Sequence, residues 1–245
     1  MQDYRIDADR NKIHATSIIE LGAVLGSDNY IGPFCIISGD VVIGNRNRFE
    51  SHCVVGCIPD VHGYEKDDIP IGKAIVGDDN YFSQFVTISA GTYRQTKIGN
   101  HCLFQKCAHV GHDIIMGNYC TLSVGTTLGG DSVVEDFVNF GLCVVTHPQT
   151  VQKRGCIYGM HSTVTKKTEQ REFAKFVGSP AKLMGANIKA REVYEAICFG
   201  SEPSEYAKRF MGDREILLKA RNRVGSQDKI GYPENGQANL VVGWI

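Results

Sequence analysis

The chain has 245 residues, of which 26 are basic and 27 acidic, and its formal net charge is −1. A chain of this length can bury a large core and can hold one elongated domain or two compact ones. The near-zero net charge and the lack of a long basic run leave no electrostatic footprint for a nucleic-acid partner. No stretch reaches the length of a membrane span and residues 1–5 lack the apolar core of a signal peptide, so we expect a cytoplasmic protein with no membrane span.

An aliphatic residue or Phe returns every six residues in the N-terminal part of the chain. The eight positions are Ile13, Ile19, Leu25, Ile31, Ile37, Ile43, Phe49 and Val55. Polar segments such as 27–29 and 44–47 fall between them, as turns between short strands require. A strict period of six is typical of a parallel β-helix, in which three hexapeptides form one triangular coil. Residues one coil apart should then stack at roughly 4.8 Å, the spacing of neighbouring strands.

The period breaks at residues 57–75, which carry charged residues and two prolines. We interpret this segment as an excursion loop. Loops that leave a rigid scaffold are favoured places for binding residues, and a tolerated insertion is the alternative.

The repeat resumes at Val76, slips by four residues near 93–97, and is regular again from Ile98. Four residues after each repeat start the side chain is small or β-branched, as at Cys102, Ala108, Ile114, Cys120, Thr126, Ser132, Val138 and Val144. Four of the nine cysteines, Cys35, Cys53, Cys102 and Cys120, occupy this position. We therefore expect buried thiols; the pairs one coil apart could bridge in principle, but a reducing cytosol favours free thiols.

The period fades after residue 145, with a last coil near 157–164 and an exit strand and turn at 176–182. Beyond it, residues 188–197 and 204–223 have apolar stripes at helical spacing. We expect a left-handed parallel β-helix over residues 1–185 and a small helical C-terminal region with a tail over 186–245.

One hexapeptide, residues 110–115, places a His-Asp pair at its centre. A histidine at the third position of a unit should project from a corner of the coil, so His112 should face solvent or a cleft. A neutral imidazole is well matched to removing a proton from a hydroxyl or ammonium group near neutral pH. Asp113 could fix the tautomer of His112 or hold substrate. A solvated surface histidine is the alternative reading.

Three further residues should lie along the same edge. Gly130 follows His112 by one coil and would leave a backbone N–H accessible to a developing oxyanion. His109 ends the preceding hexapeptide, and His147 lies two coils after Gly111. A general base, an exposed amide and additional imidazoles are thus predicted at one edge of the helix.

Four motifs carry a family resemblance: residues 31–35, the loop that begins at Pro59, residues 109–113 and residues 128–130. In this order and at this spacing, they resemble the UDP-N-acetylglucosamine O-acyltransferase family of lipid A biosynthesis over roughly residues 10–195. The resemblance implies a left-handed β-helix that forms a homotrimer, with active sites between subunits. It also implies His112 as the general base, supported by Asp113, with Gly130 as the oxyanion amide and His109 in the same pocket.

The chain departs from that family at substrate-binding positions. In the loop at 59–64 the family's aspartate is displaced by one position, to Asp60, or lost, and its lysine is absent. Asp131 stands where the family has a histidine, and His147 is followed by Pro148 where the family has glutamine. We expect Asp60, Asp131, His147 and His109 to bind substrate in a divergent paralogue. The segment 177–182 is more similar to acetyl-CoA-dependent hexapeptide transferases.

The leading hypothesis is transfer of an acyl group from a thioester donor, either acyl carrier protein or coenzyme A, to a hydroxyl or amine of a nucleotide-linked sugar. No bound cofactor and no metal is expected. The nearest alternative is an acetyl-CoA-dependent amino-sugar N-acetyltransferase. A zinc-dependent carbonic anhydrase would need three interfacial histidines and a His-x4-His spacing that the chain lacks. The alternative of another class is a β-helix that serves as a non-catalytic assembly subunit.

Overall fold

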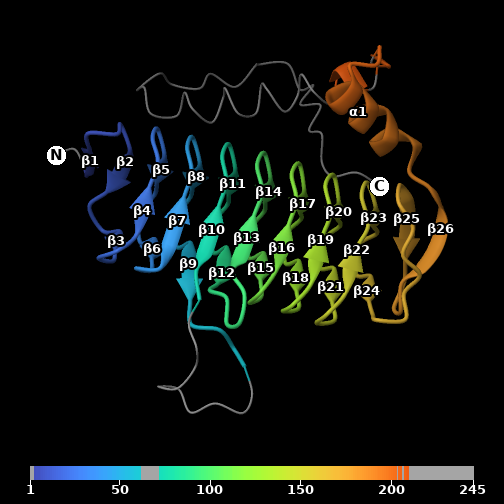
Figure 1. The fold of residues 1–245 in the computed structure, drawn as a ribbon, viewed down its shortest axis with the longest axis horizontal. Coiled ribbons are helices and arrows are strands. Elements are labelled where there is room, and N and C mark those ends of the chain that lie inside the picture. The colour runs from blue at the N-terminus through green and yellow to red at the C-terminus, as the bar shows by residue number, and fades with distance from the viewer. Residues whose placement is uncertain (1–2, 62–71, 203, 206, 210–245) are drawn as a thin grey trace, which may run out of the picture. The chain divides into compact units, whose positions relative to one another are not determined.

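The computed structural model describes residues 3–61, 72–202, 204–205 and 207–209. Short strands stack into three sheets, one on each face of a prism, as the successive arrows of Figure 1 show. Strands within each sheet are parallel, except at the two ends of the longest sheet, where β1 and β26 pair antiparallel with their neighbours. This arrangement confirms the predicted parallel β-helix.

The strand bounds follow the repeat. The longest sheet contains, in spatial order, β1 (Tyr4–Ile6), β2 (Lys12–His14), β5 (Tyr30–Ile31), β8 (Arg48–Phe49), β11 (Tyr81–Phe82), β14 (Leu103–Phe104), β17 (Thr121–Leu122), β20 (Asn139–Phe140), β23 (Ile157–Tyr158), β25 (Ala174–Val177) and β26 (Lys182–Ala186). The second contains β3 (Ile18–Ile19), β6 (Ile36–Ile37), β9 (Val54–Cys57), β12 (Thr87–Ser89), β15 (His109–Val110), β18 (Thr127–Leu128), β21 (Val145–Thr146) and β24 (Thr163–Val164). The third contains β4 (Val24–Leu25), β7 (Val41–Ile43), β10 (Ala74–Val76), β13 (Thr96–Ile98), β16 (Ile115–Met116), β19 (Val133–Val134) and β22 (Val151–Gln152).

The core is the interior of the prism. The repeat starts from Ile98 to Phe140 are buried, as predicted, whereas Ile19 and Leu25 in the first coil are only partly buried. Aromatic rings stack face to face along the axis, with centroids 4.4 Å apart for Phe49 and Phe82 and 4.6 Å apart for Phe82 and Phe104. The four core cysteines named above are buried as predicted, and all nine cysteines are free thiols.

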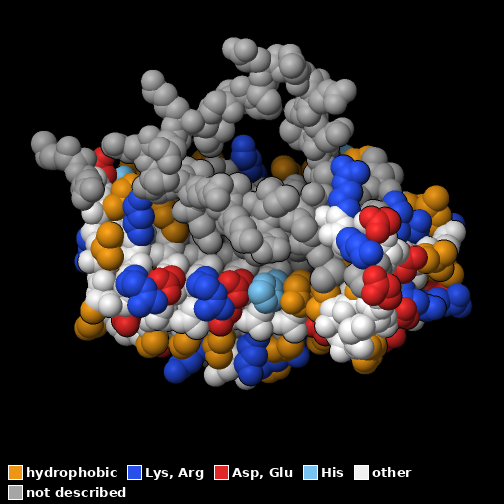
Figure 2. All heavy atoms as spheres, turned by 90° about the horizontal axis from the view of Figure 1, so that it is seen from above, with side chains coloured by type: hydrophobic (Ala, Val, Ile, Leu, Met, Phe, Trp, Pro, Cys, Tyr) orange, Lys and Arg blue, Asp and Glu red, His pale blue; other side chains and the backbone are white. Residues whose placement is uncertain are grey.

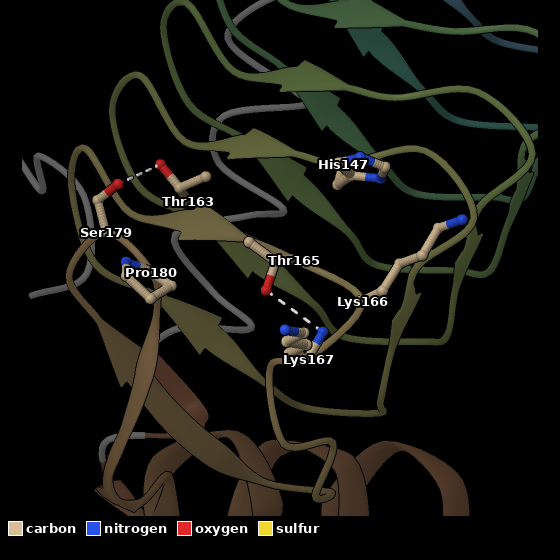
Figure 3. A pocket seen from close by; sticks show the side chains of 7 residues that line it. All are labelled: His147, Thr163, Thr165, Lys166, Lys167, Ser179 and Pro180. Carbon is tan, nitrogen blue, oxygen red and sulfur yellow. Dashed lines mark hydrogen bonds between the residues drawn. The ribbon is translucent and has the colours of Figure 1, made fainter.

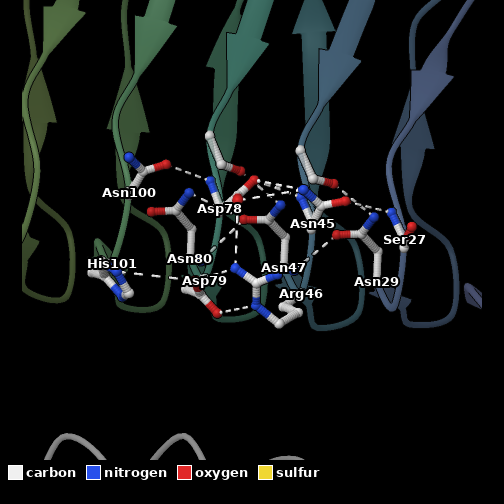
Figure 4. A network of polar contacts seen from close by, with 12 residues as sticks. Ser27, Asn29, Asn45, Arg46, Asn47, Asp78, Asp79, Asn80, Asn100 and His101 are labelled. Carbon is white, nitrogen blue, oxygen red and sulfur yellow. Dashed lines mark hydrogen bonds and ion pairs between the residues drawn. The ribbon is translucent and has the colours of Figure 1, made fainter.

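One corner of the prism is held by a ladder of buried asparagines (Figure 4). The backbone N–H of Asn47 donates to the side-chain oxygen of Asn29 at 2.8 Å, and that of Asn80 donates to Asn47 at 3.0 Å. These amides satisfy turn backbone groups that the sheets leave without partners. At the exposed rim Arg46 pairs with Asp79 at 2.7 Å, and on the face seen in Figure 2 basic and acidic side chains lie next to one another.

The chain deviates from the regular coil at two places. Arg46 contacts Asp79, 33 positions later, because the excursion loop intervenes; residues 62–71 of that loop lie outside the described residues. Thr87 stacks on His109, 22 positions later, whereas Asn100 and Asn118 are 18 apart. The predicted four-residue slip is therefore confirmed as an insertion between β12 and β13.

A second compact unit begins after Asn187. Its helix α1 (Ile188–Phe199) confirms the helix predicted at 188–197 and buries Val193. Most of the helix predicted at 204–223, and all of the tail from 225, fall outside the described residues. Within the described part of the chain no helix is long and apolar enough to cross a membrane.

Candidate active site

His112 and Asp113 lie at the corner between β15 and β16. The Asp113 backbone has φ of +58°, a left-handed conformation that turns the chain sharply here. His112 Nδ1 lies 2.7 Å from Asp113 Oδ2, while the side chain of His112 is 24% exposed and that of Asp113 is 0% exposed. Because an ionised carboxylate can only accept, Nδ1 donates to it and Nε2 presents its lone pair away from Asp113.

The Asp113 carboxylate is held by a segment that the sequence analysis did not assign to the site. Thr92 donates to it twice, from its backbone N–H at 2.8 Å and from its hydroxyl at 2.6 Å, and the backbone N–H of Arg94 donates at 3.0 Å. Burial raises the pKa of Asp113, but the hydrogen bonds from Thr92, His112 and Arg94 together lower it by more, so the net pKa lies below the usual 3.8. Asp113 therefore remains ionised.

Gly130 lies directly against the imidazole ring of His112. A Cβ at this position would stand 2.6 Å from His112 Nε2 and 2.8 Å from two ring carbons, so a side chain would displace the ring. The Gly130 backbone N–H donates to no acceptor within the described residues, which leaves it available to an oxygen of a ligand. The available amide was predicted from the sequence, but this packing reason for glycine was not.

His109 lies on β15, three residues before His112. Its Nδ1 lies 2.7 Å from the hydroxyl of Thr87. Burial lowers the pKa of His109; the charge of Asp60 partly offsets this effect, and the charge of His112 lowers the pKa further. The structure thus brings both Asp60 and His112 close enough to His109 for their charges to act on it, and His109 is neutral at neutral pH.

Asp131, which follows Gly130, is held by two side chains of the inserted segment. Arg94 forms an ion pair with it at 3.0 Å, and the hydroxyl of Tyr93 donates a hydrogen bond to it. That hydrogen bond raises the pKa of Tyr93, so the hydroxyl stays protonated. Tyr93 and Arg94 were not identified from the sequence, and the slip in the repeat was the only signal of them.

His147 lies further along the same edge and not beside His112. Its Nδ1 donates to the carbonyl of Pro148 at 2.9 Å, and its ring faces a pocket of about 520 Å³ (Figure 3). The other described residues that line the pocket carry no carboxylate; they are Thr163, Thr165, Lys166, Lys167, Ser179 and Pro180. Lys166 occupies the same hexapeptide position as His112 three coils on, roughly 14 Å along the axis.

Among residues 3–61, 72–202 and the few described beyond, no group of three or more His, Cys, Asp or Glu side chains could hold an ion.

Comparison with known proteins decides the family. The bacterial transferase hexapeptide (six repeats) family matches residues 22–57. An acyl-[acyl-carrier-protein]–UDP-N-acetylglucosamine O-acyltransferase of Aliarcobacter butzleri is 32% identical over 199 residues, which cover 73% of this chain and 75% of that protein. The chain belongs to the UDP-N-acetylglucosamine O-acyltransferase family. It is accordingly an acyltransferase of the hexapeptide-repeat class.

Further proteins resemble the chain over part of its sequence or in fold. The protein of the same name from Sulfurovum sp. is 36% identical over 132 residues, 45% of this chain and 50% of that protein. The UDP-N-acetylglucosamine acyltransferase structure from Campylobacter jejuni superimposes with a TM-score of 0.63 at 23% identity, covering 89% and 92% of the two chains. LpxA from Acinetobacter baumannii gives 0.62 at 23% identity, covering 86% and 91%. These structures share the left-handed β-helix fold with this chain.

Proposed function

We propose that the protein transfers an acyl group from an acyl carrier protein thioester to a hydroxyl of UDP-N-acetylglucosamine or a closely related nucleotide sugar, with no bound cofactor. The observation that carries the proposal is the His112–Asp113 pair, whose Nε2 points away from the carboxylate beside the available N–H of Gly130. The names of the relatives supply the donor and the acceptor.

The reaction follows from this geometry. Nε2 of His112 takes the proton of the sugar hydroxyl as its oxygen attacks the thioester carbonyl carbon, so a C–O bond forms and the carbonyl oxygen becomes an oxyanion. The Gly130 N–H donates to that oxyanion. As the tetrahedral intermediate collapses, the C–S bond breaks, and the imidazolium returns its proton to the departing thiolate. Asp113 stabilises the imidazolium between the two transfers.

The remaining site residues have binding roles in this proposal. His109 lies near the base, Asp60 lies near His109, and both would contact the acceptor sugar. Asp131, held by Arg94, would contribute to the same pocket, and His147 would contact a more distant part of a substrate because its pocket lies further along the coils.

We further propose that residues 1–185 form the catalytic β-helix domain of a cytoplasmic homotrimer, with 186–245 as a helical C-terminal region. Val124, Leu142 and Met160 support a contact between subunits: they are 39%, 38% and 50% exposed and occupy the same position in successive coils. An apolar ridge of this kind on a soluble protein favours association. Light scattering should give three times the 27.0 kDa chain mass, and a monomer at micromolar concentration would contradict the trimer.

The donor and acceptor can be tested together. The purified protein is incubated with UDP-N-acetylglucosamine and either acyl carrier protein thioesters of several chain lengths or acetyl-CoA, and the acylated nucleotide sugar is identified by mass spectrometry. We expect an ester product from the carrier-protein thioester. Because UDP-N-acetylglucosamine has no free amine, a UDP-linked amino sugar is offered in a parallel reaction. An amide product from that amino sugar and acetyl-CoA would support the N-acetyltransferase instead, and no product with any donor and acceptor would favour the assembly subunit.

A further inference from the structure

We infer that Thr92 is a positioning residue for the base, acting through Asp113, and that the segment 91–95, which contains the four-residue insertion, forms a clamp that builds this contact. The inference rests on the proposed function of His112. The insertion lengthens one coil by four residues, and these residues fold onto the corner that carries the His-Asp pair.

The clamp divides its contacts between the two oxygens of Asp113. Oδ1 accepts the backbone N–H groups of Thr92 and Arg94, at 2.8 and 3.0 Å. Oδ2 accepts the Thr92 hydroxyl at 2.6 Å and His112 Nδ1 at 2.7 Å. The backbone therefore fixes the carboxylate, while a single side-chain hydroxyl shares with His112 the oxygen that orients the imidazole.

The clamp is fastened to two successive coils. Arg94 Nε donates to the carbonyl oxygen of Asp113 at 2.5 Å, and its guanidinium pairs with Asp131 in the next coil at 3.0 Å. Gly91 permits the tight turn, because a Cβ there would stand 1.8 Å from the Arg94 carbonyl oxygen. From the other side the Asp113 N–H donates to the buried hydroxyl of Thr96 at 2.9 Å. The Thr92 hydroxyl is thus held in place independently of substrate.

The arrangement separates a catalytic from a structural effect. Thr92→Val removes the hydroxyl but keeps the shape of the side chain and both backbone donors to Oδ1. Oδ2 then loses one of its two donors, so the negative charge of Oδ2 acts more fully on His112. The oxygen that orients the imidazole is also held less firmly. The protonated imidazole should be favoured, so the base should become available only at higher pH.

The test compares turnover and its pH profile in the full-length protein. We expect Thr92→Val to lower kcat by about ten- to a hundredfold, as loss of an orienting partner typically does, with both KM values within about twofold. The acidic limb of kcat should move to higher pH, and Thr92→Ser, which keeps the hydroxyl, should restore most of the rate. Among the described residues, the charged and titratable groups linked to the His112–Asp113 corner by the contacts above are Arg94, Tyr93, Asp131 and His109, and none of them is changed in these variants.

Thr16→Val is the matched control. Thr16 also donates or accepts a hydrogen bond with a histidine, His14, at 2.8 Å, but near the start of the helix and far along it from the site. It should leave kcat unchanged. An unshifted acidic limb with wild-type kcat in Thr92→Val, or a loss that Thr92→Ser fails to restore, would overturn the inference. His112→Ala measured alongside distinguishes the failures: if that variant stays active, the proposed base is wrong, and if it alone is inactive, only the role of Thr92 is wrong.

Discussion

At the scale of single residues, the imidazole of His112 is constrained from two sides. Asp113 binds Nδ1 at 2.7 Å, and Gly130 lies against the ring. The first contact sets the tautomer and the second sets where the ring can lie. Asp113 is a neighbour because it follows His112 directly in the chain. Gly130 is a neighbour because the repeat places it one coil later.

Gly130→Ala should therefore impair the base even though it keeps the backbone N–H. The new methyl would stand 2.6 Å from Nε2 and push the ring from its place. We expect kcat to fall by about a hundredfold, because small misplacements of a catalytic group have effects of that size. Gly185→Ala is the control, since a Cβ there has no atom within 4 Å. Steady-state kinetics measure kcat for both variants. A wild-type kcat in Gly130→Ala would contradict the prediction, because it would show that the His112 ring is not displaced by the new methyl.

His109 predicts a pH effect on stability. Burial lowers its pKa below the usual 6.5, so the folded protein binds fewer protons than the unfolded chain once the pH falls below that value. Its contribution is fully present above pH 6.5 and is lost as the pH falls through the folded pKa. Between pH 7 and 5 the Tm of the wild type should therefore fall by a few degrees more than the Tm of His109→Gln. Thermal melts check this; parallel slopes for the two proteins would contradict it.

At the scale of elements, the period of six predicted the strands and their stacking well. The interior of each coil takes an apolar side chain at the same place, so Val110 and Leu128 stack one above the other. This pairing in turn determines which residues at the corners become neighbours. The same spacing placed His112 beside Gly130. The roles of Tyr93 and Arg94 could not be predicted, because the inserted segment follows no period and its path depends on contacts with Asp113 and Asp131 in other coils.

The aromatic column offers a test at this scale. Phe82 is fully buried between Phe49 and Phe104, with centroids 4.4 and 4.6 Å away. Phe82→Ala should lower the free energy of unfolding by about 3–5 kcal/mol, the usual cost of deleting a buried ring. Phe85→Ala is the control, since Phe85 is 54% exposed and should cost far less. Denaturant titration compares the two; equal losses would mean that the interior assignment is wrong.

At the scale of the whole molecule, the β-helix acts as a rigid frame along which catalytic and binding groups are spaced by coil height. The His-Asp pair and the pocket beside His147 lie on one edge, so a long substrate laid along that edge could contact both. The mapping of this edge onto the repeat was predicted from sequence. The ion pair between Arg94 and Asp131 was not predicted, because a contact between an inserted segment and a coil leaves no periodic signal in the sequence.

The most direct test of this account is turnover by His112→Ala. Wild type and variant are incubated with UDP-N-acetylglucosamine and an acyl carrier protein thioester that the wild type accepts, and product is quantified by mass spectrometry. Removal of a general base should lower kcat by roughly two to four orders of magnitude, with an unchanged melting temperature because the corner residue is partly exposed. Near-wild-type turnover by the folded variant would contradict the assignment of His112 as the base.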